Sequence, residues 1–301
     1  MQLQQSAVKK YAVEHNLKVL QPEKLKNPEF LQELKSLNAD LQIVVAFRML
    51  PESVWNMPPM GTVNLHGSLL PQYRGAAPIN WAVINGEKET GVTTFKLKHE
   101  IDTGDILLQE SFPIDENETA GDVHDRMKEI GAQLLVKTVK GLAEGKLKET
   151  PQSFLVNGDS SREKDSPNIG ATPGARQQAP GSELSTQGSR LLKHAPKIFA
   201  ETCQIDFHKS TAEVHNLIRG LSPFPGAFTY LNNKMLKIYR SEKDMMQNGQ
   251  TETVRPGEYK TDGKTYLKFA CANGYIHLKE LQQEGKKKIN IEDFLRGYRF
   301  E

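Results

Sequence analysis

The chain has 301 residues, of which 37% are hydrophobic and 25% charged, and its net charge is +2. At roughly 100 to 200 residues per domain, this length favours two domains. Cys203 and Cys271 are too few for a disulfide framework, and no apolar run approaches the roughly 20 residues that span a bilayer. These features exclude a disulfide scaffold and a helical membrane protein, and we expect a cytoplasmic protein without a metal.

The charge is unevenly distributed along the chain. Residues 1–150 hold 17 Lys and Arg against 20 Asp and Glu, whereas residues 191–301 hold 18 against 13. The C-terminal part therefore carries a net charge of +5. Such an excess is typical of a surface that binds a polyanion, although a merely solvated basic surface explains it equally well.

The first half of the chain alternates between helical and strand patterns. Apolar spacing predicts helices over residues 6–15, 23–37, 51–56, 77–85 and 119–144, and strands over 41–47, 62–66, 90–97 and 106–114. Thr119 is the expected cap of the longest helix, which Gly145 ends. This alternation favours an α/β domain over residues 1–151, built on a doubly wound, mostly parallel sheet.

The second half begins with a segment of different composition. Residues 152–190 are rich in Gly, Ser, Pro and Gln, so we expect a flexible linker there. Beyond it, a helix over 210–219 and short strands over 227–231, 235–240, 266–271 and 275–281 predict a small barrel in residues 191–301. Basic and aromatic side chains interleave in this domain, a pattern that is typical of nucleic-acid-binding surfaces. The residues are Lys234, Lys237, Arg240, Lys264, Lys268, Tyr230, Tyr239, Tyr266, Phe269 and the run Lys286–Lys288.

Polar side chains follow the strand over 62–66. Its period of two places Asn64 and His66 on one face, and the acidic turn at Asp102 follows the next predicted strand, over 90–97. An amide and an imidazole can stabilise the negative oxygen formed in acyl transfer, and a carboxylate can orient the imidazole. A structural Asn and His pair and an ordinary Asx turn are the alternatives. In the intervening loop, Tyr73 and Arg74 offer stacking and anion contacts.

These motifs resemble the methionyl-tRNA formyltransferase family. The resemblance is carried, in chain order, by Asn64–Pro71, Tyr73–Pro78, Glu89–Thr93, Asp102–Asp105, Leu192–Ile198 and Arg219–Ala227. It implies a formyltransferase sheet followed by an OB-like barrel. It also implies that the family's first strand, helix, strand and tRNA-probing loop are missing, because the chain is expected to enter after that loop.

The resemblance further implies the reaction and its residues. Asn64, His66 and Asp102 correspond to the catalytic trio, and Ser68, Leu69, Leu70 and Pro71 to the contacts with the folate carrier. The implied donor is 10-formyltetrahydrofolate, and the implied acceptor is the α-amine of methionyl-initiator tRNA, held by the basic domain of a monomer. The alternatives are a sugar-nucleotide amine formyltransferase and an inactive fragment that binds tRNA or folate.

Overall fold

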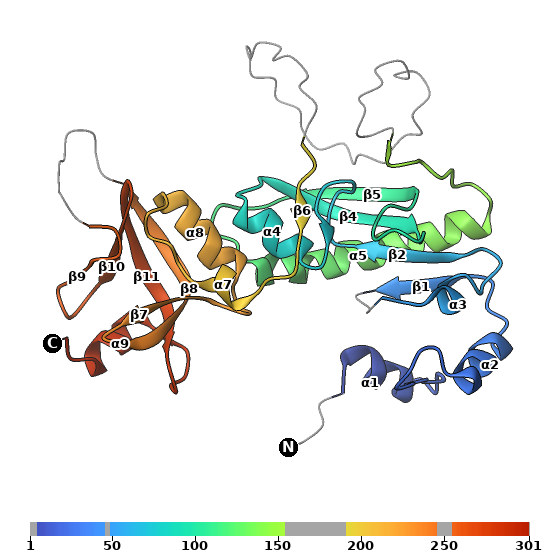
Figure 1. Ribbon diagram of the computed structural model, residues 1–301, viewed down its shortest axis with the longest axis horizontal. Helices are drawn as coiled ribbons and strands as arrows, with labels where there is room; N and C mark the ends of the chain where they lie inside the picture. The colour runs from blue at the N-terminus through green and yellow to red at the C-terminus, as the bar shows by residue number, and fades with distance from the viewer. Residues whose placement is uncertain (1–4, 46–48, 154–190, 246–254, 301) are drawn as a thin grey trace, which may run out of the picture. The chain divides into compact units, whose positions relative to one another are not determined.

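The computed structural model describes residues 5–45, 49–153, 191–245 and 255–300 (Figure 1). The chain divides into two compact units, residues 1–64 and 65–301. The boundary falls inside strand β2 (Thr62–His66), which begins in the first unit and ends in the second. Most of the expected linker, residues 154–190, lies outside the described residues.

The first unit contains helices α1 (Ala7–Glu14), α2 (Pro28–Ser36) and α3 (Glu52–Trp55) and strand β1 (Gln42–Val45). Helix α2 begins five residues later than its apolar spacing predicts. Asn27 accepts a hydrogen bond from the Glu29 amide and Pro28 occupies the first turn, so both residues favour a start at this point. The end of the strand predicted over 41–47 lies outside the described residues.

The predicted α/β sheet is confirmed, with the strand order β1-β2-β4-β5. Strands β4 (Glu89–Lys96) and β5 (Ile106–Pro113) pair antiparallel, so this edge of the sheet is a hairpin. Their connection is too short for the crossover of a dozen or more residues that parallel strands require. The hairpin therefore presents the turn with Asp102 at one end of the sheet.

Two helices complete this part of the second unit. Helix α5 (Ala120–Ala143) packs on β4 and β5, and Thr119 and Asp122 form the capping box at its start. Helix α4 (Pro78–Ile84) follows the loop after β2. The core here contains apolar side chains from both helices and from β4 and β5. They include Val83, Val92, Phe112, Val123 and Leu134.

A two-stranded parallel pair joins the loop after β2 to the chain that follows residue 190. Strand β3 (Arg74–Gly75) pairs with β6 (His194–Ala195). The amides of Tyr73 and Ala76 donate to the carbonyls of Lys193 and Ala195, at 2.6 and 2.7 Å. This pairing was not predicted, because two-residue strands have no periodicity to detect.

The C-terminal part of the second unit is an antiparallel half-barrel sheet, in the order β7-β8-β11-β10-β9, with β12 beside β11. The strands are β7 (Ala227–Leu231), β8 (Lys234–Met245), β9 (Tyr259–Thr261), β10 (Leu267–Cys271), β11 (Gly274–Gln283) and β12 (Ile289–Asn290), and the helices are α7 (Ala200–Cys203), α8 (Thr211–Gly220) and α9 (Ile291–Gly297). The core of this sheet includes Ile218, Ile238, Phe269 and Ile276, and both cysteines are buried and free.

Helix α8 lies between α4 and strand β8 of the half-barrel (Figure 1). The side-chain amide of Asn80 donates to the Gly220 carbonyl at 2.7 Å. Arg219 is buried, and its guanidinium donates to the carbonyls of Asp115 and Glu118 at 3.3 and 3.1 Å. Side chains and backbone carbonyls therefore form hydrogen bonds in both directions between the α/β part of the second unit and helix α8 of its C-terminal part.

Candidate active site

His66 is the last residue of β2, and the residue is only 7% exposed. The ring atom Nε2 lies 2.9 Å from the Tyr73 carbonyl oxygen, within the loop that follows the strand. The Phe95 ring meets the imidazole edge to face, with centroids 6.4 Å apart. The histidine is thus held between a fixed backbone acceptor and an apolar wall.

Asp102 lies in the turn between β4 and β5 and is 9% exposed. Its backbone adopts a positive φ of 55°, which few residues other than Gly, Asn and Asp tolerate. The carboxylate Oδ2 accepts a hydrogen bond from the Gly75 amide at 2.9 Å and lies 3.7 Å from His66 Nδ1. The structure therefore brings together two of the three predicted catalytic side chains, although they are far apart in the sequence.

The surroundings of the imidazole determine which ring atom can exchange a proton. A carbonyl oxygen can only accept, so Nε2 must carry the hydrogen in its contact with Tyr73. Nδ1 then faces the carboxylate of Asp102 at a distance longer than a hydrogen bond. Nδ1 is consequently the atom that can gain or lose a proton during a reaction.

Asn64 precedes His66 by two positions in β2 and is partly buried. The alternation of a strand assigns residues two apart to the same face. Asn64 belongs to the first unit and His66 to the second, so the place of this amide beside the pair stays a prediction.

The loop predicted to contact the folate carrier is tightly held. Ser68 is fully buried and donates its hydroxyl to the Gln72 carbonyl, while Thr93 donates to the Ser68 carbonyl at 2.6 Å. The Leu70 amide donates to the Thr93 hydroxyl, and Leu70 is followed by a cis peptide bond to Pro71. Of the four predicted residues only Leu69 is partly exposed, so a ligand here would meet its side chain and nearby backbone.

Tyr73 and Arg74 have other partners than the sequence suggested. Tyr73 is buried and donates its hydroxyl to Glu87, and burial is the main reason that its pKa is raised. Arg74 donates to the side-chain oxygen of Gln152. The Tyr73 ring is therefore not free for the stacking expected from the sequence, whereas the Arg74 guanidinium is partly exposed and keeps donors beyond those that Gln152 accepts.

Gln152 is the residue near this site that the sequence did not reveal. The predicted linker begins at this position, but the side chain is 3% exposed and contacts the turn that carries Asp102. No motif surrounds it, and its partners are about 50 and 78 positions away in the chain. No local pattern could have identified it.

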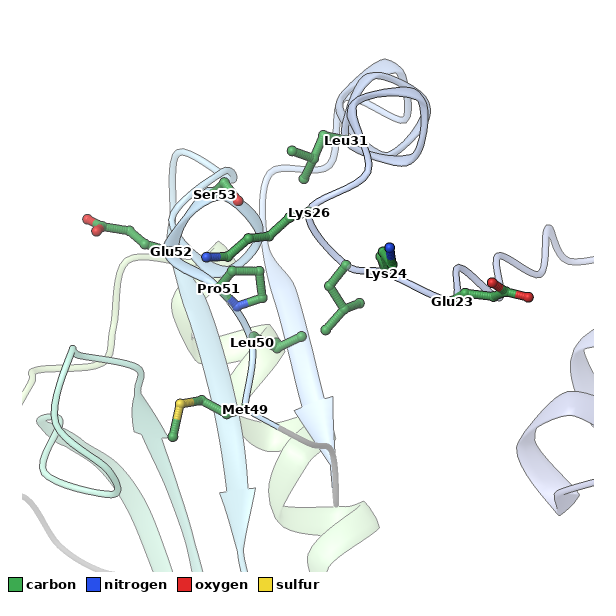
Figure 2. Close-up of a pocket in the computed structure, with 10 residues that line it drawn as sticks. Glu23, Lys24, Lys26, Leu31, Met49, Leu50, Pro51, Glu52 and Ser53 are labelled. Carbon is green, nitrogen blue, oxygen red and sulfur yellow. The ribbon is translucent and has the colours of Figure 1, made fainter.

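A separate hollow lies in the first unit, as Figure 2 shows. It is lined by residues 23–26, Leu31 and residues 49–53, with the Lys26 side chain reaching toward Pro51. None of the residues predicted for catalysis or folate binding lines it.

Several basic side chains of the half-barrel are paired. Lys268 contacts Asp244 and lies over the Tyr275 ring at 4.1 Å, and Lys288 contacts Glu280 at 3.0 Å. Lys286 and Lys287 are exposed between β11 and β12, and no ion pair found within the described ranges includes them. Phe269 is buried in the core, so its ring is not on the surface with the interleaved basic side chains.

Comparison with known proteins agrees with this architecture. The formyl transferase family model matches residues 2–139, and the model of the formyl transferase C-terminal domain matches residues 197–299. The fold is therefore that of a formyl transferase. The methionyl-tRNA formyltransferases of Bacteroides fragilis and Phocaeicola vulgatus are 46% and 48% identical to this chain over 98% and 99% of its length, and 82% and 83% of theirs. The chain belongs to the methionyl-tRNA formyltransferase family.

A solved structure shares the fold at lower identity. An N-formyltransferase from Helicobacter canadensis, in complex with folinic acid and dTDP-3-aminofucose, is 21% identical with a TM-score of 0.61. The match covers 94% of this chain and 84% of that one.

Among the residues that the structure describes, no helix is long and apolar enough to cross a membrane.

Proposed function

We propose that this chain transfers the formyl group of 10-formyltetrahydrofolate to the α-amino group of methionyl-initiator tRNA, for translation initiation. The observation that carries the proposal is the 46–48% identity, over nearly the whole chain, to relatives named methionyl-tRNA formyltransferase. The contact between His66 and Asp102 supplies a chemical basis, because formyl transfer between two nitrogens requires proton movement and a carboxylate can orient the imidazole that moves the protons.

The proposed reaction begins when the methionine amine attacks the formyl carbon. A carbon–nitrogen bond forms, and the formyl oxygen becomes an oxyanion that the Asn64 amide and a protonated His66 stabilise. His66 gives its Nδ1 proton to N10 of the donor as the bond between the formyl carbon and N10 breaks, and the oxyanion returns to a carbonyl. The neutral imidazole then takes up the proton that the attacking amine loses, which restores the protonated His66. His66 Nδ1 is placed to move these protons, because Nε2 is engaged with the Tyr73 carbonyl.

In the same proposal, Ser68, Leu69, Leu70 and Pro71 form one wall of the folate site. The hydrogen bonds that this loop forms with Thr93 and Gln109 fix its backbone before a ligand arrives. A preorganised loop loses little conformational entropy on binding. Leu69 would provide the apolar contact with the carrier.

The half-barrel is the proposed tRNA-binding part. Residues 191–301 carry a net charge of +5, and Lys286 and Lys287 extend from the turn after β11. Lysines that neutralise phosphates release counterions and so strengthen binding to nucleic acid. We propose domain limits of 1–151 and 191–301, joined by residues 152–190.

A sugar-nucleotide amine is the second candidate acceptor, because a structural neighbour was solved with dTDP-3-aminofucose. That neighbour is only 21% identical, whereas the named tRNA enzymes are more than twice as similar. The tRNA is therefore the favoured acceptor.

The test is to incubate the purified full chain with 10-formyltetrahydrofolate and, separately, methionyl-initiator tRNA or dTDP-3-aminofucose. We expect formyl-methionine on the tRNA and no formylated sugar. Formylation of the sugar alone would replace the acceptor, and tRNA binding without any product would identify a binding protein instead of an enzyme.

A further inference from the structure

The Gln152 side chain uses its entire hydrogen-bonding capacity. Its oxygen accepts from Arg74 Nε and Nη2 at 3.0 and 2.5 Å. Its nitrogen donates to the carbonyls of Asp102 and Gly104 at 2.9 and 2.8 Å. A side-chain amide has two hydrogens to donate and two lone pairs on its oxygen, so no position on it is left over.

These four bonds join the two segments that determine where the Asp102 carboxylate lies. One segment is the turn that carries Asp102 itself, whose carbonyl and that of Gly104 accept from Gln152. The other is strand β3, in which Arg74 contacts Gln152 and the next residue, Gly75, donates its amide to Asp102 Oδ2. Gln152 thus connects the backbone of the turn that carries Asp102 with strand β3, whose Gly75 amide binds the Asp102 carboxylate.

The backbone around Gln152 is itself fixed at this point. Thr150 pairs with Ile106 at the start of β5, through hydrogen bonds of 2.8 and 2.9 Å in both directions. The side chain two residues later is then directed into the interior, where it is 3% exposed. A buried amide with all its partners in place is a rigid connection, since breaking any bond would leave a polar group unsatisfied.

We propose that Gln152 is a positioning residue, which sets the distance between the Asp102 carboxylate and the His66 imidazole. The inference rests on the proposed function, because it assigns Gln152 an effect on catalysis through Asp102. Misplacing a catalytic group by about 1 Å can cost about 100-fold in rate, so a residue that touches no substrate can still govern the chemical step.

Two substitutions test this role in the full chain. Gln152→Glu keeps the shape and the contact with Arg74 but turns a donor into an acceptor facing two carbonyls. Gln152→Met has a similar volume and removes all four bonds without adding charge. Gln133→Glu makes the same chemical change on the exposed face of α5 and serves as the matched control.

The readouts are kcat and the KM values for 10-formyltetrahydrofolate and methionyl-tRNA, with kcat counted per donor-binding site so that unfolded protein is excluded. We expect kcat to fall about 10- to 100-fold in both Gln152 variants, while each KM stays within about twofold. The control should retain kcat within about twofold. A Gln152→Met variant with unchanged kcat would overturn the proposal.

The same change in an Asp102→Asn background separates positioning from a general structural effect. If Gln152 acts through Asp102, Gln152→Met should lower kcat there by less than about threefold. An undiminished loss in that background would refute the proposal. If Asp102→Asn alone leaves kcat unchanged, it is the proposed catalytic site that fails.

Hydrogen exchange of the Gly75 amide measures the geometry without any activity. In Gln152→Met this amide should exchange at least about tenfold faster, because its bond to Asp102 Oδ2 is no longer supported. Unchanged exchange at Gly75 would contradict the proposed connection, whatever the kinetics show.

Discussion

The side chains of His66 and Asp102 are held mainly by backbone groups. The Tyr73 carbonyl fixes one side of the imidazole, and the Gly75 amide fixes the carboxylate. Both groups belong to the loop after β2, so the geometry of the pair depends on the path of a few consecutive peptide units. A substitution that shifts this loop should disturb the site without removing either side chain.

Gly75 is a position in this loop where there is no room for a larger side chain. It adopts a φ of 125°, and a Cβ there would lie 2.5 Å from the Ala195 carbonyl oxygen. We expect Gly75→Ala to lower the free energy of unfolding by about 2 to 3 kcal/mol, measured by urea unfolding. Gly145→Ala also has a positive φ but meets nothing within 4 Å, so it should cost about 1 kcal/mol. Equal costs at both positions would contradict the close approach to Ala195.

His215 gives the chain a pH-dependent stability. It is buried in α8 between the Ser241 hydroxyl and the Glu116 carbonyl, and burial lowers its pKa below the ordinary 6.5. The unfolded chain therefore binds more protons once the pH falls below about 6.5. The stability linked to His215 is complete above this pH and is lost as the pH falls.

The measurement is the free energy of unfolding at pH 7.5 and 5.5 for the parent chain and for His215→Gln. We expect the variant to lose less stability between these two values than the parent. His208→Gln is the control, because that side chain is 80% exposed. An equal loss in the parent and in His215→Gln would show that His215 does not contribute.

Much of the site could be predicted from the sequence because its residues lie within recognisable strands and turns. His66 ends a strand with clear alternation, and Asp102 lies in an acidic turn between two strands. Gln152 could not be predicted, since its role depends on carbonyls and a guanidinium brought to it by the fold. A side chain that binds backbone atoms leaves no pattern in the residues it contacts.

At the scale of elements, long segments with a repeating apolar pattern were predicted, and short segments that depend on distant partners were not. The long helix α5 was predicted, and its cap at Thr119 is confirmed, because its apolar face repeats over many turns. Strands β3, β6, β9 and β12 have two or three residues each, so they exist only through pairing with distant partners. Their positions follow from tertiary structure and not from local preference.

The contact between α4 and α8 depends on Gly220. A Cβ at this position would lie 2.5 Å from Ile84 Cγ1 and 2.9 Å from the Ile84 nitrogen. We expect Gly220→Ala to destabilise the chain by about 1 to 3 kcal/mol through overpacking, measured by thermal unfolding. Gly297→Ala, at the open end of α9, should instead stabilise by up to about 1 kcal/mol. Stabilisation by both substitutions would refute the close packing of these helices.

At the scale of the whole molecule, charge and chemistry are divided along the chain. The acidic first half supplies the candidate catalytic residues, and the basic excess lies beyond residue 190. This division fits an enzyme that binds a large polyanionic substrate with one part and reacts with its end at another. It predicts that tRNA affinity and formyl transfer can be changed separately.

Replacing Lys286, Lys287 and Lys288 together by Gln should weaken tRNA binding and make it less dependent on salt. Each lost phosphate contact lowers the slope of log K against log salt by about 0.7 to 0.9. The control is the triple Gln variant of Lys128, Lys137 and Lys140, which are exposed on α5. A salt slope that is unchanged relative to the parent would remove the lysines at 286–288 from the interface.

The central claim is that the pair formed by His66 and Asp102 carries formyl transfer to methionyl-tRNA. Its most direct test is the single-turnover formylation rate of His66→Ala at saturating donor, measured beside the Kd for the tRNA. His124→Ala is the matched control, because that imidazole lies 3.2 Å from Asp125 on an exposed surface. We predict a rate lower by about 100- to 10,000-fold in His66→Ala with an unchanged Kd, and no change in the control. An undiminished rate, or a loss of tRNA binding that accounts for the whole decrease, would contradict the claim.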